Sequence, residues 1–480
     1  MKPDDIDRCK VLELGCGDGT SLLSIAYTMP NSHCVGVDLS APRIEEAKSY
    51  ADTLGLSNIE FHHQDLLEFE PEKYGTFDFI VAHGIYSWVP ELVREKIPWI
   101  YAQCLKPNGV GFISYNAYPG WHVREVARHA MQFQTELIDS PLEKVANGLR
   151  FVEFLSEASS PDPLYKSLLS EQLTYLEKKV PESIFHDDLG TFNQPFYFRQ
   201  FVERIEGSGL QFVSELEPMS FFIDDLPLFA QTALEKVWDD TVRREQYLDF
   251  IRGRFFRSTL VCQRTANPSY RPIPENLSSL YFSSSSLPIS SESSLTDNSS
   301  VAFSAPKDKE FQTDHPAIKS LLALLGSNWP RRFSFLEIQA FLESGSVHSE
   351  IQLEVLQDAI VRLINASILE PRCFCPQVAL SVSERPKVSD FARWQAGRGF
   401  ATGKNLGVTN MHGSDIQIEV DLVRDLILLT DGTRDREGLA AGLRERLAAN
   451  PADLAAVEPH LEDMIDSNLE MLRRSALLVS

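Results

Sequence analysis

One stretch near the start decides the fold of this chain: Val11-Leu12-Glu13-Leu14-Gly15-Cys16-Gly17-Asp18-Gly19-Thr20. An apolar strand containing Glu13 leads into a loop with glycine at every second position, and a predicted helix follows. Glycines let the backbone turn tightly and approach a ligand closely, and the amino end of a helix offers free N–H groups. In a dinucleotide fingerprint the third glycine stands further from the second, which leaves room for pyrophosphate. The closer spacing here, together with Glu13, favours a ligand with an amino-acid tail and no phosphate.

Short apolar runs alternate with segments of helical spacing from residue 10 to residue 115. This alternation predicts βαβ units and an α/β fold with a mostly parallel sheet. The first five predicted strands are Lys10–Leu14, His33–Asp38, Ile59–His63, Phe77–His83 and Gly109–Tyr115. A turn is predicted at Leu105–Gly109, directly before the fifth strand.

The sheet is predicted to be completed after a helical insertion. Residues 122–190 have helical patterns, and a further helix is predicted at Tyr197–Glu206. Strands predicted at Leu210–Leu216 and Phe256–Gln263 would be the sixth and seventh of the same sheet. We therefore expect one α/β domain over residues 1–265, with a helical insertion or regulatory segment at about 122–255.

The remaining chain predicts a linker and a second region. Residues 266–308 are rich in serine, proline and asparagine, a composition that buries too little apolar surface to offset the entropy of ordering. Residues 309–480 predict an α+β region that is winged-helix-like. Its expected helices are Pro316–Leu325, Phe335–Leu342, Ile351–Ile364, Val420–Leu429, Arg436–Ala448 and Leu454–Arg474, and its expected strands are Val378–Val382 and Ala476–Val479.

The composition excludes several classes of protein. A net charge of -23 and the absence of a Lys/Arg run argue against a protein that grips nucleic-acid backbone. The first residues lack the apolar core of a signal peptide, and no apolar run reaches the ~20 residues of a membrane span. Seven scattered cysteines are typical of reduced thiols, so we expect a cytoplasmic protein. Cys373 and Cys375 form a lone pair, so no metal site is expected.

Acidic side chains also follow the second and third predicted strands. Asp38 stands where a carboxylate can accept hydrogen bonds from both hydroxyls of a ribose, although taken alone it could simply precede a helix at Ser40. Asp65, followed by Leu66, stands where it can accept from an adenine amino group or form an ordinary turn. Because the carboxyl ends of parallel strands meet at the edge where open α/β sheets bind ligands, we favour one joint site that includes Glu13.

Two aromatic segments follow the fourth and fifth predicted strands: His83-Gly84-Ile85-Tyr86-Ser87-Trp88-Val89-Pro90 and Tyr115-Asn116-Ala117-Tyr118-Pro119-Gly120-Trp121-His122. Aromatic side chains with polar tips could steer a nucleophile or contact a cation. The candidate substrate-side residues are His83, Tyr115, Asn116 and Tyr118. In the alternative interpretation the aromatic residues Tyr86, Trp88 and Trp121 cover the end of the sheet as core.

This order of motifs resembles the class I S-adenosylmethionine (SAM)-dependent methyltransferases, whose Rossmann-like sheet has seven strands. The resemblance implies binding of SAM across the carboxyl ends of the first three strands. By that resemblance the cofactor-binding residues are Glu13, Gly15, Gly17 and Gly19 at its methionine and ribose side, Asp38 at the ribose, Asp65 and Leu66 at the adenine, and His83 as a cap over the methionine end.

The aromatic motif at 115–122 is similar to that of bacterial methyltransferases that carry a methyltransferase regulatory domain, a group that includes the rickettsial outer-membrane-protein lysine methyltransferases. Phe192–Glu215, Glu245–Arg252 and Leu429–Thr433 add to this likeness. The resemblance implies a protein lysine as the methyl acceptor. Members of that group have a helical segment before the first strand, whereas here the first strand is expected near Met1.

Three functions remain open on the sequence: methylation of protein lysine, methylation of a small metabolite, and SAM binding without catalysis. The C-terminal region favours a macromolecular acceptor, because a small substrate needs no docking surface. A lysine acceptor must first lose a proton, and burial among aromatic side chains favours the neutral amine. His83 is the one candidate general base, and transfer of the proton to water is the alternative.

Overall fold

The structure is a computed structural model, and it divides into two compact units that we describe separately. The first unit comprises Met1–Leu22, Ser32–Ser49 and Ile59–Tyr270, and the second comprises Leu23–Asn31, Tyr50–Asn58 and Arg271–Ser480. The residues that the structure describes are 6–158, 163–216, 223, 226–269, 273–290, 294–305, 309–344, 353–398, 401–402, 405–419, 422–448 and 455–479.

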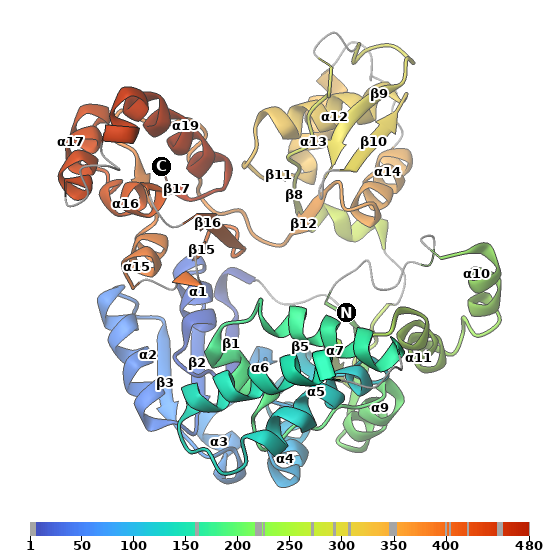
Figure 1. The fold of residues 1–480 in the computed structure, drawn as a ribbon. Helices are drawn as coiled ribbons and strands as arrows, with labels where there is room; N and C mark the ends of the chain where they lie inside the picture. The colour runs from blue at the N-terminus through green and yellow to red at the C-terminus, as the bar shows by residue number, and fades with distance from the viewer. Residues whose placement is uncertain are drawn as a thin grey trace. The chain divides into compact units, whose positions relative to one another are not determined.

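The first unit is built on a seven-stranded sheet (Figure 1), and the order of its strands is β3-β2-β1-β4-β5-β7-β6. Its strands are β1 (Lys10–Leu14), β2 (His33–Asp38), β3 (Ile59–His63), β4 (Phe77–Ala82), β5 (Leu105–Asn116), β6 (Leu210–Glu215) and β7 (Phe256–Gln263). β1 to β5 pair in parallel, and β7 runs antiparallel between β5 and β6. The predicted α/β fold with a mostly parallel seven-strand sheet is confirmed.

The turn predicted at Leu105–Gly109 is wrong, because β5 already begins at Leu105. Leu105 pairs with Phe77 of β4, and an irregularity in the ladder between Phe77 and Phe79 takes up the Pro-Asn-Gly sequence. Lys106 also bonds to both carboxylate oxygens of Asp78, at 2.7 and 2.9 Å. These long-range contacts override the local turn signal.

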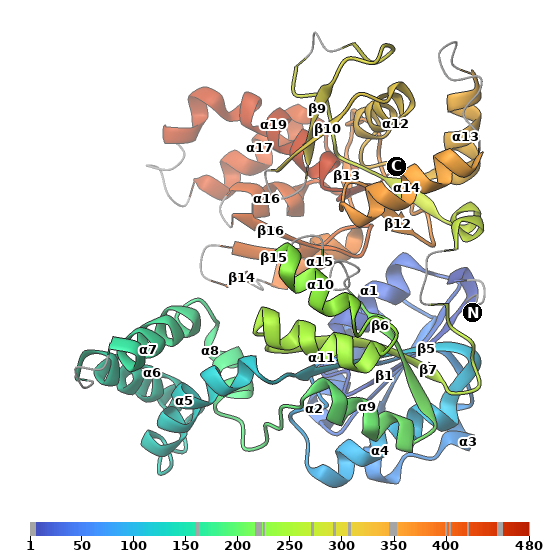
Figure 2. The same ribbon diagram turned by 90° about the vertical axis from the view of Figure 1, so that its right-hand side faces the viewer.

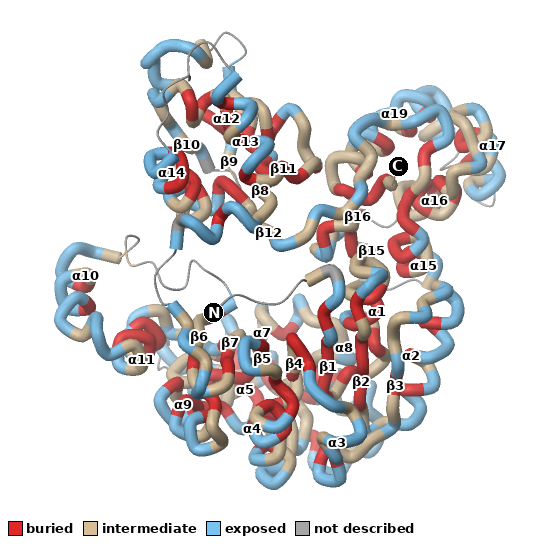
Figure 3. The backbone as a smooth tube through the Cα atoms, turned by 180° about the vertical axis from the view of Figure 1, so that it is seen from behind, coloured by how far each residue is buried: buried red, intermediate tan, exposed pale blue. Residues whose placement is uncertain are grey.

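The main core lies between one face of the sheet and the helices α4 (Glu91–Cys104) and α9 (Phe198–Gly207). The strand residues are mostly buried, as the red segments in Figure 3 show. Side chains alternate along a strand, so Ile113 and Tyr115 of β5 join this core while Ser114 points to the opposite face. The other helices near the sheet are α1 (Thr20–Thr28), α2 (Ala41–Thr53) and α3 (Pro71–Tyr74), with a 3-10 turn, η2, at Leu66–Glu68.

A helical insertion separates β5 from α9, as predicted. It consists of α5 (Gly120–Gln134), α6 (Pro141–Ala158), α7 (Pro163–Leu176), α8 (Pro181–Ser183) and a π-helix, η3 (Ile184–Asp188). Met131, Val152 and Leu169 are fully buried in a separate small core of this insertion. Along the chain, β6 is followed by α10 (Leu228–Glu235) and α11 (Thr241–Arg252) before β7 begins (Figure 2).

The weakly structured linker expected at 266–308 is wrong for the residues described there. They include η5 (Pro274–Ser279), β8 (Tyr281–Ser283) and β9 (Val301–Ala305), and Phe282 and Phe303 are fully buried. A buried side chain supplies hydrogen bonds to backbone carbonyls of the serine-rich stretch. Lys319 donates to the carbonyls of Ser294, Asp297 and Ser299. The prediction of a linker from composition fails because a few well-spaced apolar residues are enough to join a core that is built mainly by later segments.

That core also contains β10 (Lys309–Thr313), α12 (Pro316–Ser327), β11 (Phe333–Ser334), α13 (Phe335–Ser344), α14 (Leu353–Asn365) and β12 (Glu370–Arg372). The strand predicted at Val378–Val382 does not form. A hairpin of β15 (Asn405–Thr409) and β16 (Asp415–Glu419) forms further along the chain, and its two strands pair over their full length. The remaining elements are β13 (Lys387–Val388), α15 (Asp390–Arg398), β14 (Ala401–Thr402), α16 (Leu422–Leu429), α17 (Arg436–Leu447), η6 (Glu458–His460), α19 (Leu461–Arg474) and β17 (Leu478–Val479). Among the described helices, none has the length and apolar character needed to cross a bilayer.

Candidate functional site

The glycine loop after β1 is held against the end of β2. The backbone N–H groups of Gly15 and Cys16 both donate to the carbonyl oxygen of Val37, at 2.8 and 3.1 Å. Gly15, Gly17 and Gly19 all have positive φ, at 71°, 56° and 74°. L-residues rarely adopt this conformation, so the loop requires glycine at each of the three positions.

The three glycines differ in what surrounds them. A Cβ at Gly15 would lie 2.6 Å from Ile85, and one at Gly19 would lie 2.5 Å from Phe61. A Cβ at Gly17 would meet nothing within 4 Å. Gly15 and Gly19 therefore allow close packing of the protein on itself, whereas Gly17 leaves backbone exposed to open space where a ligand can approach.

Asp38 lies at the end of β2 and faces this loop. Its Oδ2 accepts a hydrogen bond from the Gly17 N–H at 2.9 Å, and its Oδ1 accepts one from the Ser40 N–H at 2.8 Å. The helix-start interpretation therefore describes the geometry of Asp38, and its carboxylate also stands beside Gly17. A carboxylate oxygen has two acceptor positions, so these bonds leave capacity for hydroxyl donors.

Asp65 occupies the corresponding place after β3. Its Oδ1 accepts from the Leu67 N–H at 2.9 Å, and the residue caps the short turn η2. Leu66, the first residue of that turn, is buried. The turn interpretation thus describes the geometry of Asp65, and its half-buried carboxylate remains at the same sheet edge as Asp38.

Glu13 is a buried carboxyl group that lacks a complete set of partners. The residue is 5% exposed, and its Oε2 has no hydrogen-bond partner among the described residues. Burial, followed by the charges of Asp18 and Asp38, raises the pKa of Glu13 from 4.5 to about 8. A buried acceptor beside two further carboxylates is suited to a cationic donor, which fits the ammonium group of an amino-acid tail.

His83 follows β4 at the same edge. Its Nδ1 lies 3.0 Å from the Oγ of Ser114 on β5, and this hydroxyl also accepts from the Gly84 N–H at 2.9 Å. Desolvation of the ring lowers the pKa of His83, although the residue as a whole remains exposed. A neutral imidazole that is fixed at one nitrogen is able to accept a proton at the other.

Tyr115 does not face this edge, and its prediction as a substrate-side residue is wrong. It is fully buried, and its ring stacks on Phe201 of α9 with 4.1 Å between centroids. Tyr86 is likewise fully buried against Phe201 and Phe196. Strand alternation directs Tyr115 into the core while Ser114 points to the other face, so the core interpretation applies to both tyrosines.

Asn116 and Tyr118 lie where the chain leaves β5. The Asn116 side chain donates to Oδ1 of Asn193 at 2.8 Å, and its backbone N–H donates to Oγ of Ser87 at 2.9 Å. Tyr118 is half-buried, and its hydroxyl donates to Glu125 at 2.6 Å. Asn116 thus connects three segments, and Tyr118 presents an aromatic side chain close to a carboxylate.

Aromatic rings surround Tyr118. Its ring stacks on His122 with 4.0 Å between centroids and lies 5.2 Å from Tyr197. Next to Ser87 in the sequence, the indole N–H of Trp88 is buried without a hydrogen-bond partner among the described residues. Sequence reasoning missed Glu125, which lies on α5, and Asn193 and Tyr197, which lie in the segment before α9. Only folding brings these residues to the end of β5.

Comparison with known proteins places these observations in a family. Residues 6–151 match a methyltransferase domain, residues 180–263 a predicted methyltransferase regulatory domain, and residues 384–477 the C-terminal winged helix domain of PKMT. PKMT2 from Rickettsia typhi in complex with AdoHcy is 27% identical, with a TM-score of 0.84 over 100% of this chain and 96% of that one. The chain is a SAM-dependent methyltransferase with a methyltransferase regulatory domain and a C-terminal winged helix domain of the PKMT type.

Two relatives of this methyltransferase come from Rickettsia prowazekii, and both are uncharacterized proteins. One is 26% identical over 99% of this chain and 88% of its own length. The other is 34% identical over 43% of this chain and 82% of its own length. Within the described residues, no group of three or more His, Cys, Asp or Glu side chains could hold a metal ion.

Proposed function

We propose that this methyltransferase transfers methyl groups to lysine side chains of a protein substrate. The observation that carries the proposal is the likeness to PKMT2 along the whole chain, including the C-terminal winged helix domain that a metabolite methyltransferase does not need. The net charge of -23 supports an acceptor rich in lysine, because an acidic protein attracts cationic partners over long range.

The cofactor would be held by the residues at the carboxyl ends of β1, β2 and β3. Glu13 would accept from the ammonium of the methionine tail, Asp38 from the ribose hydroxyls, and Asp65 from the adenine, with Gly17 leaving room for close approach. When bound, SAM supplies an electrophilic methyl group on its sulfonium. The chain's own contribution is to align the acceptor with that methyl group and to exclude water.

The acceptor would enter between the ends of β4 and β5. His83, Asn116 and Tyr118 come from the two segments that border this edge, and the rings around Tyr118 offer faces that attract a cation. A lysine acceptor must lose one proton for each methyl group it gains. His83 is the candidate to take that proton, since desolvation favours its neutral form.

SAM binding is expected to release about one proton at pH 7, and Glu13 is its source. The raised pKa of about 8 keeps Glu13 protonated in the unliganded protein at this pH, and a neighbouring ammonium lowers it again. The pKa of Glu13 is higher in the folded protein than in the unfolded chain. The unliganded protein therefore loses stability as the pH rises from 4.5 to about 8. Calorimetric titrations in two buffers of different ionisation enthalpy measure the release. Glu13→Gln should remove it, and an equal release in that variant would contradict the assignment.

The acceptor is tested with the full chain, tritiated SAM and a lysine-rich protein, alongside the same protein with its lysines acetylated. Label is expected in the unmodified protein and not in the acetylated one. Equal labelling of both would exclude lysine as the acceptor. Label confined to a small-molecule extract would favour the metabolite alternative, and SAM binding without any transfer would favour a non-catalytic protein.

A further inference from the structure

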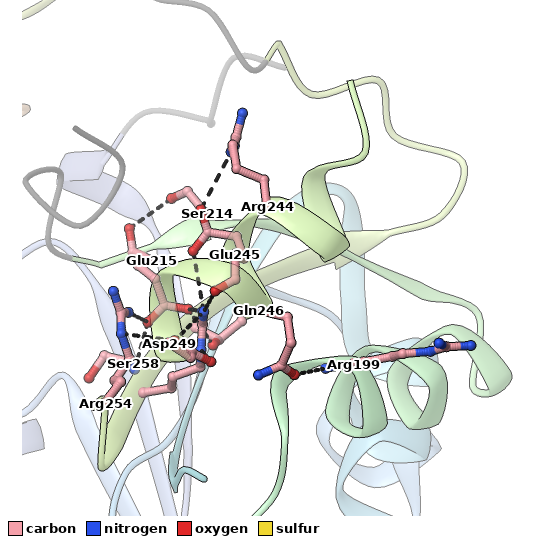
Figure 4. Close-up of polar contacts among 11 residues, drawn as sticks. Arg199, Ser214, Glu215, Arg244, Glu245, Gln246, Asp249, Arg254 and Ser258 are labelled. Atoms are coloured by element: carbon pink, nitrogen blue, oxygen red, sulfur yellow. Dashed lines mark hydrogen bonds and ion pairs between the residues drawn. The ribbon is translucent and has the colours of Figure 1, made fainter. Parts of the chain in front are cut away.

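A cluster of charged side chains is buried within the matched regulatory segment 180–263, and the proposed reaction does not use it. It joins β6, α11 and β7 (Figure 4). Its members are Glu215, Glu245, Asp249, Arg254 and Arg257. The side chain of Arg257 is 0% exposed, as are those of Glu245 and Asp249.

Arg257 is the centre of this Arg257 cluster. Its guanidinium binds Asp249 through two hydrogen bonds, of 3.0 and 2.8 Å, and donates to Glu215 at 2.6 Å. A third carboxylate, that of Glu245, lies at 3.3 Å. The guanidinium also stacks over the ring of Phe198 in α9, 3.9 Å from its centroid. One side chain therefore connects β6, α9 and α11.

A second set of contacts ties the same elements together. Arg254 reaches Asp249 at 3.1 Å and Glu215 at 3.6 Å. The Arg199 N–H of α9 donates to the Gln246 side chain of α11 at 3.2 Å. Fully buried ion pairs add little net stability compared with apolar packing, because desolvation offsets their attraction. Their geometry, however, is strict, since a bidentate pair fixes both distance and angle.

The elements joined by the Arg257 cluster hold the acceptor-side loop, residues 117–120. The Ala117 N–H donates to the Phe255 carbonyl at 2.9 Å, and the Gly120 N–H donates to the Arg254 carbonyl at 3.0 Å. From the other side, the Tyr118 N–H donates to the Phe196 carbonyl at 3.0 Å.

The Arg254 carbonyl belongs to a member of the Arg257 cluster, and the Phe255 carbonyl is two residues from Arg257. The Phe196 carbonyl is two residues from Phe198, which the cluster contacts. A Cβ at Gly120 would lie 2.5 Å from the Gly253 carbonyl oxygen, so the loop is pressed closely against the turn before β7.

We propose that Arg257 is a positioning residue for methyl transfer, and that the regulatory segment acts on the reaction by holding loop 117–120. The bonds of Arg257 to Asp249 and Glu215 fix the turn before β7, and its contact with Phe198 fixes the start of α9. These two segments hold the backbone around Tyr118 in place by hydrogen bonds from both sides. The link to an acceptor rests on the proposed function, whereas the link to the loop does not.

The test uses the full chain with Asp249→Asn, which keeps the shape of Asp249 and removes one charge from the bidentate pair. The matched control is Asp78→Asn, another buried carboxylate of the sheet, which is paired with Lys106 and belongs to β4. Hydrogen exchange of peptides covering residues 115–122 is measured first, since it needs no acceptor. Faster exchange of this loop is expected in Asp249→Asn and not in Asp78→Asn.

Kinetics with the acceptor give the second measurement. The kcat/KM for the acceptor is expected to fall about tenfold or more in Asp249→Asn, because small misplacement of a reacting group is costly, while the Kd for SAM stays within about twofold. If Asp249→Asn fails to fold, Gly120→Ala displaces the same loop from the turn before β7, because its Cβ would meet the Gly253 carbonyl oxygen, and it should give the same pattern. Unchanged exchange of residues 115–122 when the cluster is broken, or equal losses in SAM and acceptor binding, would overturn the proposal. Faster exchange of residues 115–122 without any methyl transfer to lysine would exclude lysine as the acceptor. The role of the Arg257 cluster in holding loop 117–120 would still stand.

Discussion

Replacing Asp38 by alanine is expected to weaken SAM binding by about 30- to 150-fold, or about 2–3 kcal/mol. The Asp38 carboxylate is expected to accept hydrogen bonds from two ribose hydroxyls, and the alanine variant lacks both bonds. Asp38 also accepts from the Gly17 N–H at 2.9 Å, so its removal frees the loop that the cofactor must approach. Calorimetric titration of the wild type and the variant gives the two dissociation constants.

Two further variants test whether the loss of affinity comes from the Asp38 carboxylate itself. Asp38→Asn keeps the shape of the side chain and one acceptor oxygen, so its loss should be smaller than that of Asp38→Ala. Asp52→Ala removes an exposed carboxylate from the same βα unit, on α2, and should leave the affinity unchanged. Equal affinity in the wild type and Asp38→Ala would remove Asp38 from the cofactor site.

Gly17→Ala is expected to cost about 10- to 100-fold in SAM affinity, because a methyl group would fill space that the cofactor needs. The stability of the fold should fall by about 1–2 kcal/mol, the strain of an L-residue in the left-handed region. Among the described residues, apart from Gly17 and its two chain neighbours, no atom lies within 4 Å of the added Cβ, so a clash with them does not explain a loss of affinity.

Gly209→Ala is the matched control. Gly209 has a φ of 88°, its Cβ position also meets nothing within 4 Å, and it lies in the turn between α9 and β6. Chemical denaturation should give similar losses of stability for the two variants, while titration should give a loss of SAM affinity for Gly17→Ala alone. If both variants bind SAM as the wild type does, the open space beside Gly17 is not the cofactor site.

The residues of the proposed cofactor edge could be selected from the sequence because their signals are local. The spacing of Gly15, Gly17 and Gly19 forces a tight loop, and apolar runs ending in Asp38 and before Asp65 define where the next strands stop. Parallel strands bring these ends to one edge whatever the details of packing. The acceptor edge had no such signal, because its residues come from several distant segments.

Tyr115 shows why the acceptor side was only partly predictable. The sequence placed it correctly at the end of β5, but one residue decides whether a strand side chain points to the core or to the site. The helix α9, which supplies Phe201, sets that direction. The Arg257 cluster was invisible for the same reason, since Glu215 and Asp249 read as ordinary surface charges until β6 and α11 meet.

The sequence by itself determined the seven strands of the first unit, the glycine loop, and the carboxylates that mark the proposed cofactor edge. Local backbone preference and hydrophobic period act over a few residues and need no knowledge of distant partners. The tertiary structure alone decided that the serine-rich segment around Phe282 and Phe303 joins a core, that Tyr115 turns inward, and that Arg257 lies at the centre of three carboxylates. Burial and pairing depend on segments far apart in the chain, and their energies arise only when those segments come together.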